Sequence, residues 1–170
     1  MRRQQNNHGK LKIPMVVVLN NIRSLHNVGS IFRTADGAGV EKIWLCGLTG
    51  HPPRNEIKKT ALGAEMYIPW EYREDVVSVL TQLKKDQYLI VVLEQTDSSI
   101  AYDQFIPQFP LCLVIGNEIE GADSSLLPLC DKAVEIEMDG VKNSLNAAVA
   151  FGVVAYHFKY RWKNLSINPK

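Results

Sequence analysis

The sequence predicts an α/β fold, with helices flanking a parallel sheet. Several apolar runs of five or six residues, such as Leu111–Ile115, show no alternation with polar residues. Such runs are typical of strands that are covered on both faces. Segments of helical periodicity separate these runs, and strands that alternate with helices indicate a parallel sheet. A length of 170 residues, 46% of them hydrophobic, suits one domain, which we place at 14–162 between basic tails at 1–13 and 163–170.

The first half of the chain predicts five alternating elements. In order, they are a strand at 14–19, a helix from residue 28, a strand at 40–46, a helix at 55–62 and a short strand at 66–70. Asn27 can cap the first helix, and Gly37 and Gly39 can end it. Pro69 confines the short strand to an edge or an end of the sheet.

The second half predicts a longer series of elements. In order, they are a helix at 74–86, a strand at 88–93, the strand at 111–115, a short helix, a strand at 134–138 and a long helix that opens at 144–146. The apolar face predicted for the helix at 74–86 consists of Val76, Val77, Leu80 and Leu83. Asn143 or Ser144 can cap the last helix.

The last helix is apolar on every side over residues 147–155. A helix of this kind is buried all round, and in a small domain the sheet covers only one of its faces. A second copy related by two-fold symmetry is the commonest cover for the other face. We therefore expect a homodimer, with a tightly packed internal helix as the alternative.

Composition indicates a cytoplasmic protein with no membrane segment and no metal. The chain has no apolar run long enough to span a membrane and no signal peptide. Cys46, Cys112 and Cys130 are widely spaced, as expected of buried thiols in a reducing compartment. The net charge of +1 conceals basic ends, because 1–12 and 159–170 each carry four basic residues and no acidic ones. Basic tails suit a polyanion such as nucleic acid, although they also serve solubility.

Two loops are candidates for a ligand site, because ligands bind at the carboxyl ends of strands in open α/β sheets. Gly116–Gly121 follows one predicted strand, and Asp139–Asn143 follows another and leads into the helix that opens at 144–146. No G-x-G-x-x-G, phosphate-binding G-x-x-x-x-G-K-[ST] or G-x-S-x-G motif is present. These absences argue against dinucleotide-binding folds, phosphate-loop enzymes and the usual serine hydrolases. The residues alone leave an α/β domain with a polar cleft.

Three stretches, 27–35, 113–121 and 136–150, resemble the three ordered motifs of the SpoU (TrmH-like) RNA ribose methyltransferases of the SPOUT superfamily. The resemblance extends from about Pro14 to Tyr160. It implies a C-terminal deep trefoil knot, which periodicity cannot reveal. It also implies S-adenosylmethionine as cofactor, a homodimer with a shared active site, and methylation of a ribose 2′-hydroxyl in tRNA, with rRNA as the second choice.

The resemblance assigns roles residue by residue. The catalytic set that it implies is Asn27, Arg33, Glu118, Ser144 and Asn146. The cofactor-binding set is Leu93, Glu94, Gly116, Ile136, Met138, Leu145, Asn146 and Ala150. The RNA-binding set is Arg23, Arg33, Lys58 and Lys59. One departure is Glu137, which replaces the proline of the usual Ile-Pro-Met motif.

Each assignment has a simpler alternative. Arginine seldom gives up its proton, so we hypothesise that Arg33 binds substrate phosphate and stabilises negative charge on oxygen. Its structural alternative is a surface ion pair with Asp36. Glu118 can instead anchor its loop by accepting backbone amides. For the whole protein, the alternatives are a non-catalytic RNA-binding or assembly module and an enzyme that methylates a base.

Overall fold

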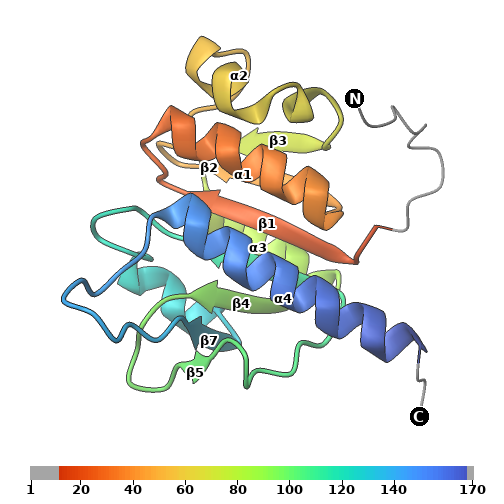
Figure 1. Ribbon diagram of the computed structural model, residues 1–170, viewed down its shortest axis with the longest axis vertical. Helices are drawn as coiled ribbons and strands as arrows, with labels where there is room; N and C mark the ends of the chain where they lie inside the picture. The colour runs from red at the N-terminus through yellow and green to blue at the C-terminus, as the bar shows by residue number, and fades with distance from the viewer. Residues whose placement is uncertain (1–11, 168–170) are drawn as a thin grey trace.

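The computed structural model describes residues 12–167 and has one seven-stranded sheet between two layers of helices (Figure 1). In sheet order the strands are β3 (Trp70–Arg73), β2 (Lys42–Cys46), β1 (Met15–Asn20), β6 (Leu111–Ile115), β4 (Leu89–Leu93), β7 (Lys132–Glu135) and β5 (Ile100–Ala101). The helices are α1 (Leu25–Ala38), α2 (Asn55–Ala61), α3 (Val76–Lys85) and α4 (Ala147–Ile167), with 3₁₀ helices η1 (Ala64–Met66) and η2 (Ser124–Leu129). All neighbouring strands pair in parallel, so the predicted α/β architecture, a parallel sheet flanked by helices, is confirmed.

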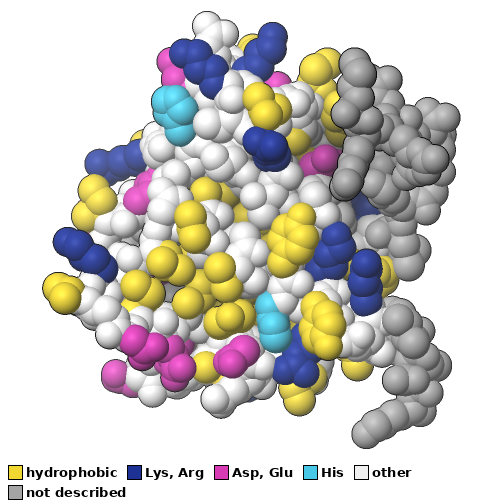
Figure 2. Space-filling model, viewed as in Figure 1, with side chains coloured by type: hydrophobic (Ala, Val, Ile, Leu, Met, Phe, Trp, Pro, Cys, Tyr) yellow, Lys and Arg dark blue, Asp and Glu magenta, His cyan; other side chains and the backbone are white. Residues whose placement is uncertain are grey.

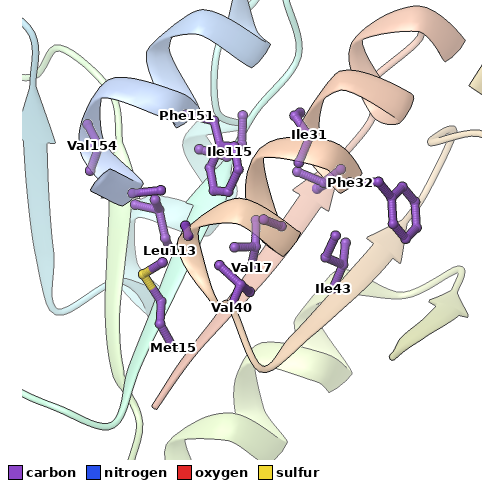
Figure 3. Packing of buried hydrophobic residues seen from close by; sticks show 14 of the residues in the cluster. Met15, Val17, Ile31, Phe32, Val40, Ile43, Leu113, Ile115, Phe151 and Val154 are labelled. Atoms are coloured by element: carbon purple, nitrogen blue, oxygen red, sulfur yellow. The ribbon is translucent and has the colours of Figure 1, made fainter. Parts of the chain in front are cut away.

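The central strands are buried on both faces, which explains their unbroken apolar runs. In β1, Met15 and Val17 belong to one core cluster, and Val16 and Val18 belong to the other. Helices α1 and α4 cover the first face, and α3 and η2 cover the second. Figure 3 shows the first cluster, where side chains of α1 and α4 lie over β1, β2 and β6.

The first helix begins earlier than predicted. Ser24, not Asn27, is its N-cap, because the Ser24 hydroxyl accepts a hydrogen bond from the Asn27 backbone N–H at 3.2 Å. Asn27 therefore lies in the first turn, where its side chain is free for other contacts. Gly39 ends the helix in the left-handed conformation, at φ 83°, as predicted.

Three further predictions need correction. The segment before Trp70 forms η1 and an irregular turn, and the strand begins only at Trp70, although it does lie at the sheet edge. Strand β7 starts two residues earlier than predicted, and the two-residue strand β5 was not predicted. On α3, Val77 is 43% exposed and Val79 is buried, because Asp75 caps the helix and sets which residues face the sheet.

The two predicted basic tails lie only partly within residues 12–167. Most of the predicted tail at 1–13 falls outside the described residues. At the other end, α4 continues to Ile167, into the range predicted as the C-terminal tail. None of the described helices is long and apolar enough to cross a membrane.

Candidate functional site

A cavity of about 230 Å³ lies where β4, β6 and β7 end, against the loop that precedes α4. The parallel sheet brings these strand ends to one edge. Residues predicted for the site line much of it: Leu93, Glu94, Gly116, Glu118, Ile136, Met138, Ser144, Leu145 and Ala150. Its other walls are Gln95, Ile115, Asn117, Ile119, Glu120, Gly121, Glu135, Asn143 and Ala147.

The loop that follows β6 is held in a tight conformation by Glu94. The Glu94 carboxylate accepts the backbone N–H of Ala122 at 2.7 Å and that of Gln95 at 3.0 Å. Gly116 permits this close approach, since a Cβ there would lie 2.3 Å from the Ala122 nitrogen. Gly121, at φ 73°, lies against the same carboxylate. Glu94 thus shapes the cavity wall through the loop backbone.

Glu118 ties this loop to the start of α1. Its carboxylate accepts the backbone N–H groups of Arg23 and Ser24 and the side-chain amide of Asn27, each at 3.1 Å. Partial burial opposes the charge, but these hydrogen bonds and one from its own backbone hold the pKa of Glu118 below the usual value of 4.5. Glu118 therefore accepts backbone amides, as in the alternative interpretation in which it anchors its loop.

A second pair of side chains extends this network to α4. The Asn146 side chain donates to the Oδ1 atom of Asn27 at 3.0 Å. Its own Oδ1 accepts the backbone N–H groups of Ala148 at 2.9 Å and Val149 at 3.3 Å, so Asn146 caps α4. The cap predicted at Asn143 or Ser144 is wrong by two or three residues. Glu118, Asn27 and Asn146, one from each motif, form one hydrogen-bonded cluster.

Arg33, the remaining residue of the predicted catalytic set, does not line the cavity at the strand ends. It lines a separate open hollow, and it is exposed. Six residues along a helix turn the side chain by about 240° and advance it by about 9 Å, so Arg33 cannot share the face of Asn27. Within the described residues Arg33 forms no ion pair, and the alternative pairing with Asp36 is absent.

The other residues predicted to contact RNA are Arg23, Lys58 and Lys59, and all three are exposed. Arg23 meets Glu118 through its backbone, which leaves its side chain in solvent. Lys58 and Lys59 are exposed neighbours on α2, but only Lys59 lines the hollow with Arg33. In the described part of the chain, no cluster of His, Cys, Asp or Glu could hold a metal ion.

Sequence reasoning missed two polar residues that shape the site. Asn117 accepts the backbone N–H groups of Ile119 and Glu120, and donates to the carbonyl of Asn21 at 2.9 Å. Ser24 caps α1 and donates its backbone N–H to Glu118. The available signal was the position of these residues directly after β1 and β6, where polar side chains of a parallel sheet gather.

The fold is that of a parallel α/β protein with a cavity at the carboxyl edge of its sheet, where ligands bind in proteins of this class. Residues 14–156 match the SpoU rRNA Methylase family, and the chain belongs to this family. The family prediction made from the three motifs is thus confirmed.

Individual relatives agree with this assignment. A putative TrmH family tRNA/rRNA methyltransferase from Staphylococcus haemolyticus is 30% identical over 89% of this chain and 61% of its own length. A TrmH/SpoU tRNA modifying enzyme from A. aeolicus has a similar structure, with a TM-score of 0.84 and 25% identity over 93% of this chain and 80% of that one. An AdoMet-bound rRNA methyltransferase from Sinorhizobium meliloti gives 0.79 and 26%, over 86% and 56%. The chain spans about three-fifths of the length of the curated relatives it matches first.

Proposed function

We propose that this protein transfers a methyl group from S-adenosylmethionine to a ribose 2′-hydroxyl of RNA, with tRNA ahead of rRNA as the substrate. The observation that carries the proposal is the hydrogen-bonded cluster of Glu118, Asn27 and Asn146 beside the cavity. Family membership supports the reaction class. The A. aeolicus relative, described as a tRNA modifying enzyme, supports the preference for tRNA.

The cavity has the chemistry that the methyl donor requires. Leu93, Ile136 and Met138 supply apolar walls suited to a base. The loop at Gly116 brings backbone close to the cavity, where N–H and C=O groups can hold polar parts of a ligand. When bound, S-adenosylmethionine supplies an electrophilic methyl group. Glu137 takes the place of the proline of the usual Ile-Pro-Met motif, and its neighbours Ile136 and Met138 still line the cavity.

The predicted catalytic residues would orient the reactants and stabilise negative charge on the 2′-oxygen. Glu118 fixes Asn27, and Asn27 fixes Asn146, so the start of α4 is held against the cavity. Ser144, which lines the cavity, and Asn146, which donates to Asn27, would position the ribose. Arg33 keeps its proton, binds phosphate and stabilises negative charge that develops on the 2′-oxygen. Holding the two reactants in line supplies much of the rate enhancement.

A homodimer would bring Arg33 to the cavity of the partner. Within one chain the guanidinium and the cavity are separate. Helix α4 buries Phe151, Val154 and Phe158, whereas Val149, Tyr156 and Tyr160 stay exposed along another stripe. Figure 2 shows hydrophobic side chains gathered over the face on which α4 lies. Covering this stripe with a second copy would assemble a shared site.

We also propose that the C-terminal segment passes through a loop of the chain as a deep trefoil knot. Strand β6 lies between β1 and β4, and β7 lies on the other side of β4, so the last third of the chain crosses strands formed earlier. Family membership supports this threading. An experimental structure in which the chain ends, drawn apart, leave no knot would contradict it.

Labelled methyl transfer to bulk tRNA and rRNA tests the function. We expect transfer to tRNA that disappears in Arg33→Ala. Nuclease digestion should give resistant dinucleotides, because a 2′-O-methyl group blocks cleavage of the adjacent bond. Label in mononucleotides would indicate base methylation instead. RNA binding without any transfer would indicate a non-catalytic module.

A further inference from the structure

Three aromatic side chains form a cluster on β3, the strand at the edge of the sheet (Figure 1). Trp70 and Tyr72 project to the same face, because residues two apart in a strand share a face. The His51 ring, from the loop after β2, stacks on Trp70 with ring centres 6.0 Å apart and lies 5.1 Å from the Tyr72 ring. None of the three residues lines the cavity at the strand ends, so the proposed catalytic site does not use them.

The loop that carries His51 is anchored to the end of β1. Thr49, which is only 2% exposed, donates its hydroxyl to the carbonyl of Leu19 at 2.9 Å and accepts the backbone N–H of Ile22 at 3.0 Å. The side chain of Asn21 accepts the backbone N–H of Leu48 at 2.9 Å. These hydrogen bonds position the histidine ring before any ligand arrives, which lowers the entropic cost of binding.

The rings have bound polar atoms but remain partly open to solvent. Tyr72 donates its hydroxyl to the carbonyl of Gly47 at 2.9 Å, yet the residue is 37% exposed. The half-buried His51 has its Nδ1 atom 2.9 Å from the carbonyl oxygen of Pro52. At these separations the rings leave no cage between them for a methylated ammonium ion. What the cluster can offer a ligand is therefore flat π surface.

Two cations near the cluster have no ion pair. Arg54 follows His51 by three residues, and Lys58 lies one turn further, where its backbone N–H donates to the Arg54 carbonyl at 3.0 Å. Both side chains are exposed, and neither forms an ion pair with any described residue. The carboxylate of β3, Glu71, points to the opposite face and pairs with Lys42 at 2.8 Å. Aromatic rings beside unpaired cations suit single-stranded nucleic acid, which carries both flat bases and phosphates.

The cluster lies toward the same ends of the strands as the cavity. Tyr72 is the third of the four β3 residues, and its hydroxyl reaches the loop after β2. In the sheet order β3 is three strands away from β6, which corresponds to about 14 Å at the usual strand spacing of about 4.8 Å. A single-stranded RNA segment that enters the cavity with one nucleotide can therefore continue across the rings.

We propose that the cluster of His51, Trp70 and Tyr72 stacks on a base of the substrate RNA that flanks the methylated nucleotide, with Arg54 and Lys58 beside it for the RNA backbone. The proposal rests on the proposed function, which makes RNA the ligand. Stacking accepts any base, because every base has a π face. The rings therefore add affinity and hold the strand without reading its sequence.

An exposed tyrosine outside the cluster provides a matched control. Tyr67 is 76% exposed and makes no ring contact within residues 12–167. We expect Tyr72→Leu and His51→Ala each to weaken binding of bulk tRNA about five- to tenfold, as for the loss of one stacked base. Tyr67→Leu should weaken binding less than about twofold. Tyr72→Phe keeps the ring and should keep most of the affinity.

Salt dependence and a polyanion without bases separate stacking from charge. A stacked ring releases no counterions, so Tyr72→Leu should leave the slope of log affinity against log salt unchanged. Arg54→Ala should reduce the magnitude of this slope by about 0.7, the value for one phosphate contact on a single strand. Inorganic polyphosphate has the charge of RNA without its bases, and wild type and Tyr72→Leu should bind it equally.

Two results would overturn the stacking surface. One is equal weakening of tRNA and polyphosphate binding in Tyr72→Leu, and the other is wild-type affinity for tRNA in both ring variants. Thermal unfolding shows which variants are folded. His51 lies in a loop, so His51→Ala keeps the test decisive if Tyr72→Leu does not fold.

Methyl-transfer kinetics separate this proposal from the proposed function, because RNA binding is measured without the methyl donor. If wild type binds tRNA more tightly than Tyr72→Leu but transfers no methyl group, the stacking surface stands and the enzymatic function fails. If Tyr72→Leu transfers methyl groups with the kcat and the KM for tRNA of wild type, the function stands and the stacking surface fails. We expect Tyr72→Leu to raise KM with little change in kcat.

Discussion

The three residues of the hydrogen-bonded cluster have only one consistent arrangement of donors and acceptors. Backbone N–H groups of α4 donate to Asn146, so its Oδ1 faces the helix and its Nδ2 donates to Asn27. Asn27 must then accept with Oδ1 and donate with Nδ2 to Glu118. Every group that faces Glu118 is therefore a donor, and the carboxylate is required in its charged form.

Glu118→Gln tests this requirement. The glutamine amide would direct N–H toward groups that also donate, so we expect a loss of about 1 kcal/mol in the free energy of unfolding at pH 7. Methyl transfer should fall at least about tenfold, because about 1.4 kcal/mol of lost transition-state stabilisation suffices for this. Denaturant titration and a transfer assay measure the two effects. Glu74→Gln is the matched control, since the exposed Glu74 side chain makes no hydrogen bond among the described residues and lies outside the cavity.

The same substitution predicts a pH dependence of stability. The pKa of Glu118 is lower in the folded protein than the usual 4.5, so the charged form contributes stability at pH values above that usual value. This contribution is lost as the pH falls through the folded-state pKa. The stability difference between wild type and Glu118→Gln should hold from pH 7 to about 5 and close below 4.5. A difference that grows in acid would contradict the assignment.

Asn146→Asp separates helix capping from the contact with Asn27. Aspartate is also a good N-cap, so α4 should keep its stability, and Tm should move by less than about 3 °C. The lost Nδ2 donor places a carboxylate against Oδ1 of Asn27, and we expect methyl transfer to fall by about two orders of magnitude. Thermal unfolding and single-turnover transfer measure both. Wild-type transfer in Asn146→Asp would show that capping is its only role.

The sequence predicted the members of the cluster better than their contacts. Asn27 and Asn146 were selected by motif, yet Ser24 and Asn146 turned out to be the helix caps. Each loop offers several residues that can cap, and tertiary contacts decide among them. Glu118 fixes the chain at Ser24 across 94 positions of sequence, a constraint that local pattern cannot contain.

At the scale of elements, the packing of α2 on α1 depends on one glycine. Gly29→Ala would place a Cβ against the backbone of Ile57 and the side chain of Thr60. We expect a loss of about 1–3 kcal/mol, typical of overpacking, and a fall in Tm of about 2–4 °C per kcal/mol. In Gly152→Ala the added Cβ would make an ordinary 3.6 Å contact with Thr34, so this variant should not be destabilised. Calorimetry of both variants measures their Tm, and an equal Tm for Gly29→Ala and Gly152→Ala would contradict the prediction.

Elements with a clear apolar run or helical pattern were predicted well, and short elements without one were not. The run at 111–115 matches β6, and the helix at 55–62 matches α2 within a residue. The strand expected at 66–70 fails because Ala64–Met66 forms a 3₁₀ turn after Gly63, and pairing with β2 starts at Trp70. Strand β5 has two residues, too few to carry a pattern.

At the scale of the whole molecule, periodicity could give the parallel sheet but not its order. Strand β6 lies between β1 and β4, although 90 residues (21–110) separate β1 from β6 in the sequence. Long-range order of this kind depends on how the loops cross, about which a strand's own residues say nothing. Likewise, the apolar composition of α4 predicted that the sheet would leave part of the helix uncovered, but not which residues would remain exposed.

The exposed stripe of α4 predicts the effect of a charge on assembly. Val149 is 52% exposed and lies on a different face of α4 from the buried Phe151 and Val154. Val149→Asp adds an acid to the first turn, where it suits the helix dipole, so folding should be kept. We expect a dimer for wild type and a mass near 19.1 kDa for the variant, by sedimentation equilibrium. A wild-type monomer at micromolar concentration would refute the proposed assembly.

Mixed dimers test whether the site is shared. In the proposed arrangement each site combines Arg33 of one subunit with Asn146 of the other. Arg33→Ala and Asn146→Ala homodimers then lack any intact site, whereas a mixed dimer has one. Random reassociation of equal amounts makes half of the dimers mixed, so transfer should recover to about a quarter of the wild-type rate. If both residues acted within one subunit, every site in the mixture would carry one substitution and the rate would stay at the level of the separate variants. Recovery on mixing, absent when either variant is mixed with itself, therefore identifies a site built from two chains.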